Sequence, residues 1–136
     1  MSDDEIPGIE FGGIDETTDA GPDTSDEAND ERLITIAAIG PYGDDGRLVG
    51  VGDVEAQARQ AFANVTSLLA AEGVGLDDII KLTYYVADEG GLPLVTAIRD
   101  AFVDGRVIAG TFAAVTTLSA PDVLVEVDVF AIRKSS

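Results

Sequence analysis

The segment from residue 52 to residue 88, GDVEAQARQAFANVTSLLAAEGVGLDDIIKLTYYVAD, constrains the fold of this chain more than any other. Its apolar residues recur at the spacing of one buried helical stripe. Those residues are Val54, Ala58, Ala61, Phe62, Val65, Leu68 and Leu69. Asp53 stands where an N-cap acceptor is needed, and Gly73 stands where a left-handed residue ends a helix. The segment therefore predicts a long amphipathic helix from Asp53 to Gly73.

A strand is predicted after this helix, over residues 79–87. Its residues alternate in two sets, which are Ile80, Leu82, Tyr84 and Val86 on one face and Ile79, Lys81, Thr83 and Tyr85 on the other. Both sets contain apolar side chains, so both faces of the strand should be covered.

Four further elements are predicted on either side. A β-rich run at 33–38 ends at Gly40-Pro41, and a second helix starts near Pro93, which suits a first helical turn. Two strands follow, at 107–117 and 123–133. The order is therefore strand, helix, strand, helix, strand, strand, in a single domain, because 136 residues suffice for one core.

The last strand has two different faces. Its apolar face consists of Val123, Val125, Val127 and Val129, and its mixed face consists of Leu124, Glu126, Asp128 and Phe130. The valine face should meet the helices. The mixed face needs another cover, and we expect a subunit interface that leaves the two carboxylates beside a solvent-filled cleft.

Two residue types with side chains important in catalysis and metal binding are missing from the chain. It has no cysteine and no histidine, which excludes disulfides, thiolate nucleophiles, zinc-thiolate sites and the commonest general base. A metal would need oxygen ligands. Asp44-Asp45-Gly46 is predicted to be a turn, because the other ligands of a calcium loop do not follow it. We expect neither a metal nor a cofactor.

The charge is strongly negative, with 26 acids against 8 bases. Such a surface repels nucleic acids and anionic membranes, so neither is an expected partner. It is typical of adaptation to high salt, and the alternative is a cationic partner. No apolar run approaches the roughly 20 residues of a spanning helix, and no signal-peptide pattern opens the chain. The expectation is a cytoplasmic, soluble protein.

Residues 1–31 differ in composition from residues 32–136. Eleven acids and no lysine or arginine occur in residues 1–30. The segment is predicted to be a solvated acidic tail, partly disordered, in which residues 9–11 could form an edge strand. A tail that docks on a basic protein partner remains the alternative.

Residues 33–133 resemble the Rid (reactive intermediate deaminase) family. The positions that carry the resemblance are Gln57, Asn64, Leu69, Gly73, Leu76-Asp77-Asp78, the run KLTYYVAD at 81–88, Pro121-Asp122 and Val125-Glu126-Val127. The resemblance implies an α+β fold, with a mixed β-sheet and two helices packed on one face. It also implies a homotrimer with three clefts between its subunits.

Active Rid proteins hydrolyse enamines and imines to a keto acid and ammonia, and an arginine grips the substrate carboxylate. The resemblance puts that arginine position at Gly110, the family's Ser-Gly pair at Ala37-Ala38, and an asparagine of its second helix at Thr96. The glutamate that orients water in the family is retained as Glu126. The clamp for the carboxylate is therefore missing.

Three hypotheses follow. The first is a Rid homotrimer with a small-molecule cleft that lacks ordinary 2-imino acid deaminase activity. The second is an imine or enamine hydrolase, in which Glu126 activates water while Gly110, Thr111 and Arg106 contact the substrate. The third is an interaction protein that uses residues 1–31. An RNA-cleaving activity, ascribed to some Rid relatives, ranks below these because the chain is acidic and has no histidine.

Overall fold

The computed structural model describes residues 31–134, so most of the acidic segment, including the predicted edge strand at 9–11, lies outside the described residues. The predicted order of elements is confirmed. The strands and helices are β3 (Glu31–Ile39), α3 (Val54–Ala71), β4 (Ile79–Val86), α4 (Leu92–Val103), β5 (Ala109–Ala114) and β6 (Val125–Lys134).

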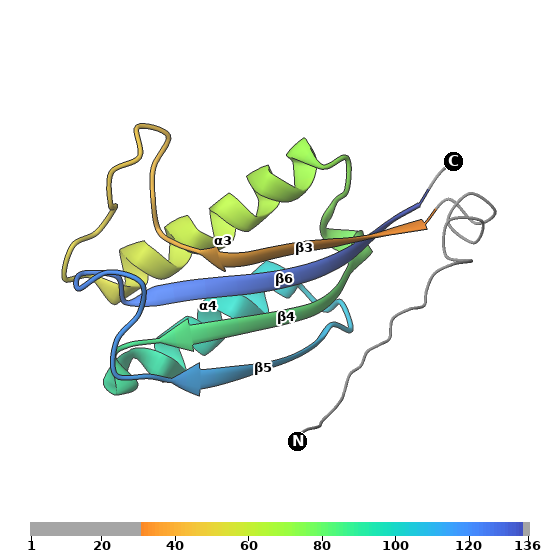
Figure 1. Ribbon diagram of the computed structural model, residues 1–136. Helices are drawn as coiled ribbons and strands as arrows, with labels where there is room; N and C mark the ends of the chain where they lie inside the picture. Colours follow the sequence, from red (N-terminus) through yellow and green to blue (C-terminus); the bar gives the residue numbers. More distant parts are fainter. Residues whose placement is uncertain (1–30, 135–136) are drawn as a thin grey trace, which may run out of the picture. The chain divides into compact units, whose positions relative to one another are not determined.

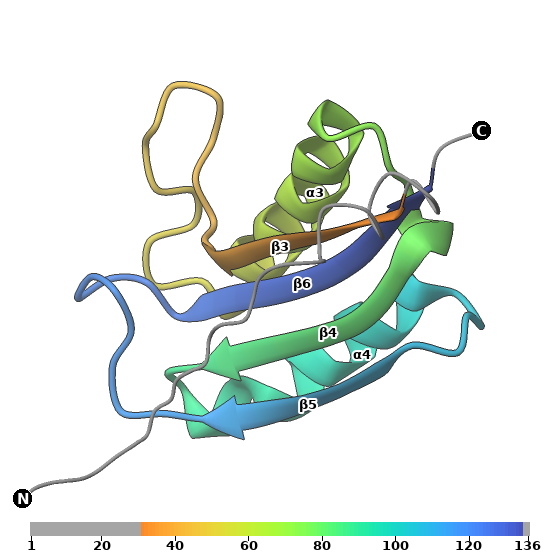
Figure 2. The same cartoon turned by 45° about the vertical axis from the view of Figure 1, so that its right-hand side comes forward.

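The strands form one sheet in the order β3-β6-β4-β5. β4 runs parallel to β5 and antiparallel to β6, so the sheet is mixed. Both α3 and α4 lie on the same face of this sheet (Figures 1 and 2). The predicted α+β architecture is therefore confirmed. None of the helices in residues 31–134 is both long enough and apolar enough to cross a membrane.

Helix α3 begins and ends as its sequence predicts. The Asp53 side chain accepts a hydrogen bond from the Ala56 N–H at 3.1 Å, which satisfies a backbone donor of the first turn. Gly73 adopts a left-handed φ of +80°, which an L side chain rarely tolerates. The predicted stripe is buried except for Val54, which is partly buried, and Leu68, which is exposed.

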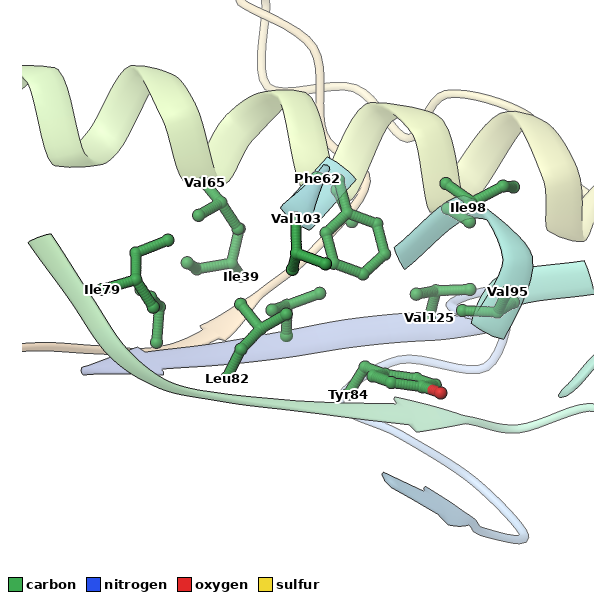
Figure 3. Close-up of a cluster of buried hydrophobic side chains, with 14 of the residues drawn as sticks. Ile39, Phe62, Val65, Ile79, Leu82, Tyr84, Val95, Ile98, Val103 and Val125 are labelled. Carbon is green, nitrogen blue, oxygen red and sulfur yellow. The ribbon is translucent and has the colours of Figure 1, made fainter. Parts of the chain in front are cut away.

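The core lies between the helices and the sheet. Figure 3 shows Phe62 and Val65 of α3 and Val95 and Ile98 of α4 above Leu82 of β4. All four valines of the predicted apolar face of the last strand, Val123, Val125, Val127 and Val129, are buried. Burial of this apolar surface drives the helices onto the sheet.

The start of β4 departs from the predicted alternation. A register shift between Ile79 and Lys81 interrupts its pairing with β6. Ile79 is consequently buried in the core, whereas Ile80 is 47% exposed. Simple alternation grouped Ile80 with Leu82, Tyr84 and Val86, which are buried. That grouping was wrong for Ile80 because a β-bulge inserts an extra residue.

The last two strands are shorter at their starts than predicted. β5 begins at Ala109, after the turn in which Arg106 donates its N–H to the Val103 carbonyl. β6 begins at Val125, because the Val123 N–H donates to the Ala120 carbonyl in the preceding turn. Each of these backbone donors is used by a turn and not by the sheet.

Gln57 is the most heavily hydrogen-bonded buried polar side chain of α3. It is 0% exposed, and its Nε2 donates to the carbonyls of Gly50 and Asp122 at 3.0 and 2.9 Å. Its Oε1 accepts the Leu124 N–H at 2.7 Å. One side chain therefore fixes the loop before α3 to the loop before β6.

Ala38, near the end of β3, has a left-handed φ of 57°. This conformation is unfavourable for alanine and open to glycine, so we expect Ala38→Gly to raise the free energy of unfolding by about 0.5–1 kcal/mol. Chemical denaturation measures the change. Ala37→Gly is the matched control, because Ala37 lies in the same strand without a left-handed φ, and glycine there should destabilise. Equal effects of the two substitutions would contradict the prediction.

Candidate functional site

The face of the sheet opposite the helices carries the polar residues of the central strands. Register pairs place Tyr85 beside Glu126, Thr83 beside Asp128 and Thr111 beside Thr83. The residues between them in each strand point to the opposite face of the sheet, which the helices cover. We call this surface the open face; it consists of Lys81, Thr83, Tyr85, Ala109, Thr111, Ala113, Glu126, Asp128 and Phe130.

Glu126 is held by the loop that precedes its own strand. Its side chain is buried, with the residue only 7% exposed. Glu126 Oε2 accepts hydrogen bonds from the Ser119 N–H, at 3.2 Å, and from the Ser119 hydroxyl. Two donors thus compensate for partial removal of the carboxylate from water and fix its orientation. This is the arrangement that a general base or a water-orienting group requires.

Asp128 is held by different partners. Its Oδ1 accepts the Ala38 N–H at 2.7 Å, and its Oδ2 accepts the Tyr85 hydroxyl at 3.1 Å. The left-handed backbone conformation of Ala38 therefore directs its N–H toward the open face. Within residues 31–134, no three acidic side chains come together as a set that could hold a metal ion.

The contact with Asp128 affects the ionisation of Tyr85. The hydrogen bond to the carboxylate, together with burial and the nearby negative charge, raises the pKa of the Tyr85 phenol above its ordinary value of 10.0. Each of the three causes favours the neutral phenol over the phenolate.

This shift predicts a pH dependence of stability. In the unfolded chain Tyr85 loses its proton near its ordinary pKa of 10.0, whereas the folded protein keeps that proton to higher pH. The contribution to stability is therefore complete below pH 10 and is lost as the pH rises through the higher folded pKa. Ultraviolet titration of tyrosinate should show that Tyr85→Phe removes a tyrosine that ionises above pH 10. Tyr42→Phe is the control, and it should leave that ionisation in place. Loss of a group that ionises at or below pH 10 in Tyr85→Phe would contradict the assignment.

The predicted substrate-binding residues do not lie together. Thr111 is on the open face with Glu126. It pairs with Thr83 of β4, which in turn pairs with Asp128, two residues along β6 from Glu126. Gly110 pairs with Leu82, and a Cβ at Gly110 would collide with the Leu82 carbonyl oxygen. Position 110 therefore has no room for a side chain.

Arg106 lies at the other end of the domain from Glu126. Its Nε donates to Asp77 Oδ1 at 2.6 Å, and its Nη1 donates to the Val103 carbonyl at 3.2 Å. Asp77 precedes β4, and Glu126 pairs with Tyr85 near the end of β4, so about 20 Å of strand separates them. Arg106 connects a turn to the end of α4 in this structure.

Lys81 is the cation among the open-face residues. Its Nζ lies 5.4 Å from the centroid of the Phe130 ring, a cation–π contact. Lys81 lies four residues before Tyr85, which is the residue of β4 that pairs with Glu126. None of the described open-face residues is an arginine, so none of them places a guanidinium group beside the Glu126 carboxylate.

Two members of this site, Ser119 and Tyr85, were not predicted as such from the sequence. Ala38 was named only through the resemblance, and its contact with Asp128 was not predicted. The alternation of β4 places Tyr85 on one face with Thr83, but only the cross-strand register brings its hydroxyl to Asp128. Nothing in the sequence indicates that Ser119 folds back to Glu126.

Comparisons with known proteins agree with this fold. Residues 25–133 match the family described as Endoribonuclease L-PSP. A 2-iminobutanoate/2-iminopropanoate deaminase of Salmonella typhimurium is 34% identical over 86 residues, covering 60% of this chain and 66% of that protein. The chain thus matches just under two thirds of the length of these curated relatives.

Solved structures show the same architecture. A Rid family protein of unknown function from Yersinia pestis is 30% identical with a TM-score of 0.64, covering 71% of this chain and 77% of that one. Yeast Mmf1 is 25% identical with a TM-score of 0.69, covering 75% and 80% of the two chains.

Proposed function

Because the chain belongs to the endoribonuclease L-PSP family, the family of the Rid proteins, we propose that its open face binds a small molecule without ordinary 2-imino acid deaminase activity. We place this ligand in a cleft between the subunits of a cytoplasmic homotrimer. In this proposal a neighbouring subunit covers the open face, which carries the exposed residues Lys81 and Thr111 beside the half-buried Phe130.

The proposal rests on the absence of a cationic side chain at position 111. β5 presents Ala109, Thr111 and Ala113 to the face that carries Glu126, and none of them is a cation. A carboxylate ligand there would lack the bidentate partner that arginine provides. A charged pair in a desolvated cleft contributes on the order of 2–5 kcal/mol, so its absence favours a less anionic ligand.

A second candidate function is supported by Glu126. The buried carboxylate and its two hydrogen bonds from Ser119 would suit a residue that activates water, and the Salmonella relative is named a deaminase. In this alternative, Thr111 orients an imine or enamine substrate, and Glu126 removes a proton from the attacking water.

An imine-hydrolysis assay separates the two candidates. 2-Iminobutanoate and 2-iminopropanoate would be generated in molar potassium chloride, and keto acid and ammonia would be followed with wild type and Glu126→Gln. The proposal expects both proteins to match the uncatalysed rate. Turnover by wild type that is about 100-fold or more faster than by Glu126→Gln, the size of a general-base contribution, would replace it with the hydrolase.

A further inference from the structure

Two aspartates of the chain, Asp45 and Asp104, are followed directly by a glycine. An aspartate in such a pair can react with the backbone of its neighbour, because glycine has no Cβ to shield its own backbone nitrogen from the aspartate carboxyl group. Both aspartates and both glycines are exposed to solvent. The two pairs therefore share the same chemistry, and their local structure is what distinguishes them.

The Asp45–Gly46 pair is held in a hydrogen-bonded turn. Asp45 Oδ1 accepts the Arg47 N–H at 2.9 Å, and the Gly46 N–H donates to the Gly43 carbonyl at 2.9 Å. The Gly43 N–H donates in turn to the Arg47 carbonyl at 2.9 Å. Both groups that would react are thus engaged, and these three hydrogen bonds oppose any rearrangement of the turn.

The Asp104–Gly105 pair lies at the end of α4, where neither reacting group is engaged. Within residues 31–134, the structure gives no hydrogen-bond or ion-pair partner to the Asp104 carboxylate or to the Gly105 N–H. A Cβ built at Gly105 would meet no atom within 4 Å, so the space around the pair is open. One turn hydrogen bond spans the pair, from the Arg106 N–H to the Val103 carbonyl at 3.0 Å.

Asp104 also has an unfavourable backbone conformation. Its φ of 50° and ψ of 54° are left-handed, which costs free energy in a residue other than glycine. With this ψ the Gly105 nitrogen lies anti to the Asp104 Cβ, so a reaction between the two groups requires rotation about the Cα–C bond of Asp104. Because Asp104 gives up a strained conformation and one hydrogen bond when it rearranges, this rearrangement costs less free energy than the opening of the turn at Asp45.

We propose that Asp104 forms a succinimide with Gly105 in the folded protein and is converted to isoaspartate, whereas Asp45 is protected. The Gly105 nitrogen attacks Cγ of the protonated Asp104 carboxyl group, and the N–H proton leaves with the carboxyl hydroxyl as water. A water molecule then opens the ring. Its addition at Cγ restores aspartate, and its addition at the backbone carbonyl carbon leaves a chain that runs through Cγ, which is isoaspartate.

Isoaspartate changes the end of α4, because it adds one methylene to the backbone. The added methylene separates Val103 from Arg106, whose N–H and Nη1 both donate to the Val103 carbonyl, at 3.0 and 3.2 Å. Arg106 Nε also donates to Asp77 Oδ1 at 2.6 Å, so this side chain joins α4 to the turn before β4. The modification therefore weakens the connection between these two elements, and it does not depend on the function proposed for the open face.

Incubation of the intact protein in heavy-oxygen water at neutral pH tests the proposal, since opening of the ring places one heavy oxygen in the product. After digestion in ordinary water, mass spectrometry measures the label at each aspartate, and fragment ions distinguish isoaspartate from aspartate. We expect label to accumulate at least about tenfold faster at Asp104 than at Asp45, because three hydrogen bonds oppose the reaction at Asp45 and one opposes it at Asp104. In protein unfolded by urea the two sites should be labelled at similar rates, because the turn that protects Asp45 is lost.

Asp104→Gly removes the carboxyl group and suits the left-handed backbone, so this variant should fold and should lose the label at the end of α4. Asp45→Ser is the matched control, and it should leave the labelling of Asp104 unchanged. The proposal is overturned if folded wild type is labelled no faster at Asp104 than at Asp45, or if unfolding leaves the ratio of the two rates unchanged. It is also overturned if label at the end of α4 persists in Asp104→Gly.

Discussion

Replacing Gln57 by leucine is expected to lower the free energy of unfolding by about 3 kcal/mol. Leucine has a similar size, so the change leaves little cavity, but it removes all three hydrogen bonds of a side chain that is 0% exposed. The carbonyls of Gly50 and Asp122 and the N–H of Leu124 would then be left without these partners. Each buried polar group left unpaired costs about 1–3 kcal/mol.

Chemical and thermal denaturation measure this effect, which should appear as a fall in melting temperature of about 10–20 °C. Gln60→Leu is the matched control on the same helix. Gln60 is only partly buried and bonds to Asn64 and to the Tyr42 carbonyl, which water can reach, so we expect a loss below about 1 kcal/mol. Similar losses for the two variants would show that Gln57 does not join the loops as described.

We expect Gln57→Leu to affect the open face as well, through the backbone of the loop before β6. Gln57 contacts Asp122 and Leu124, which lie in and after the loop that carries Ser119 to Glu126. Gln57 thus also helps to hold the loop that brings Ser119 to the Glu126 carboxylate.

Much of the fold could be predicted because local signals agreed with each other. The cap at Asp53, the left-handed glycine at Gly73 and the apolar stripe between them all specified α3. The alternating valines of β6 specified which face meets the helices. These features depend on neighbours within a few residues, which is the range over which sequence patterns are informative.

The errors came from backbone irregularities. The turn hydrogen bond from the Val123 N–H to the Ala120 carbonyl is local, but the alternation of apolar residues runs through it unchanged. The bulge at Ile79 depends on pairing with Ala131, which is distant in sequence, so alternation alone did not reveal it. The candidate site was less predictable for the same reason. Glu126 was singled out by its place in β6, but its contact with Ser119 and the contact of Asp128 with Ala38 require the assembled sheet.

The second large effect is expected from Thr111→Arg. Thr111 is exposed, lies in extended backbone and shares the open face with Glu126, so an arginine there can reach a ligand beside that carboxylate. Gly110 is unsuitable for this experiment, because even a Cβ would collide with the Leu82 carbonyl. The added guanidinium should grip the carboxylate of a 2-imino acid in two places.

We expect Thr111→Arg to raise the rate of 2-iminobutanoate hydrolysis about 30-fold or more over wild type, the lower end of the contribution of a desolvated charge pair. Thr111→Lys should give a smaller gain, because an ammonium group lacks the planar fork. Thr66→Arg, on the exposed side of α3, is the control for added charge alone.

The most direct test of the central claim is the initial rate of 2-iminobutanoate hydrolysis by wild type, Thr111→Arg and the double variant Thr111→Arg, Glu126→Gln, measured together in molar potassium chloride. We predict that wild type is inactive, that Thr111→Arg is active and that the double variant is inactive. The reason is that the open face of wild type has the Glu126 carboxylate and lacks only a cation that binds the substrate carboxylate. An active wild type, or a Thr111→Arg variant that stays inactive while correctly folded, would contradict that claim.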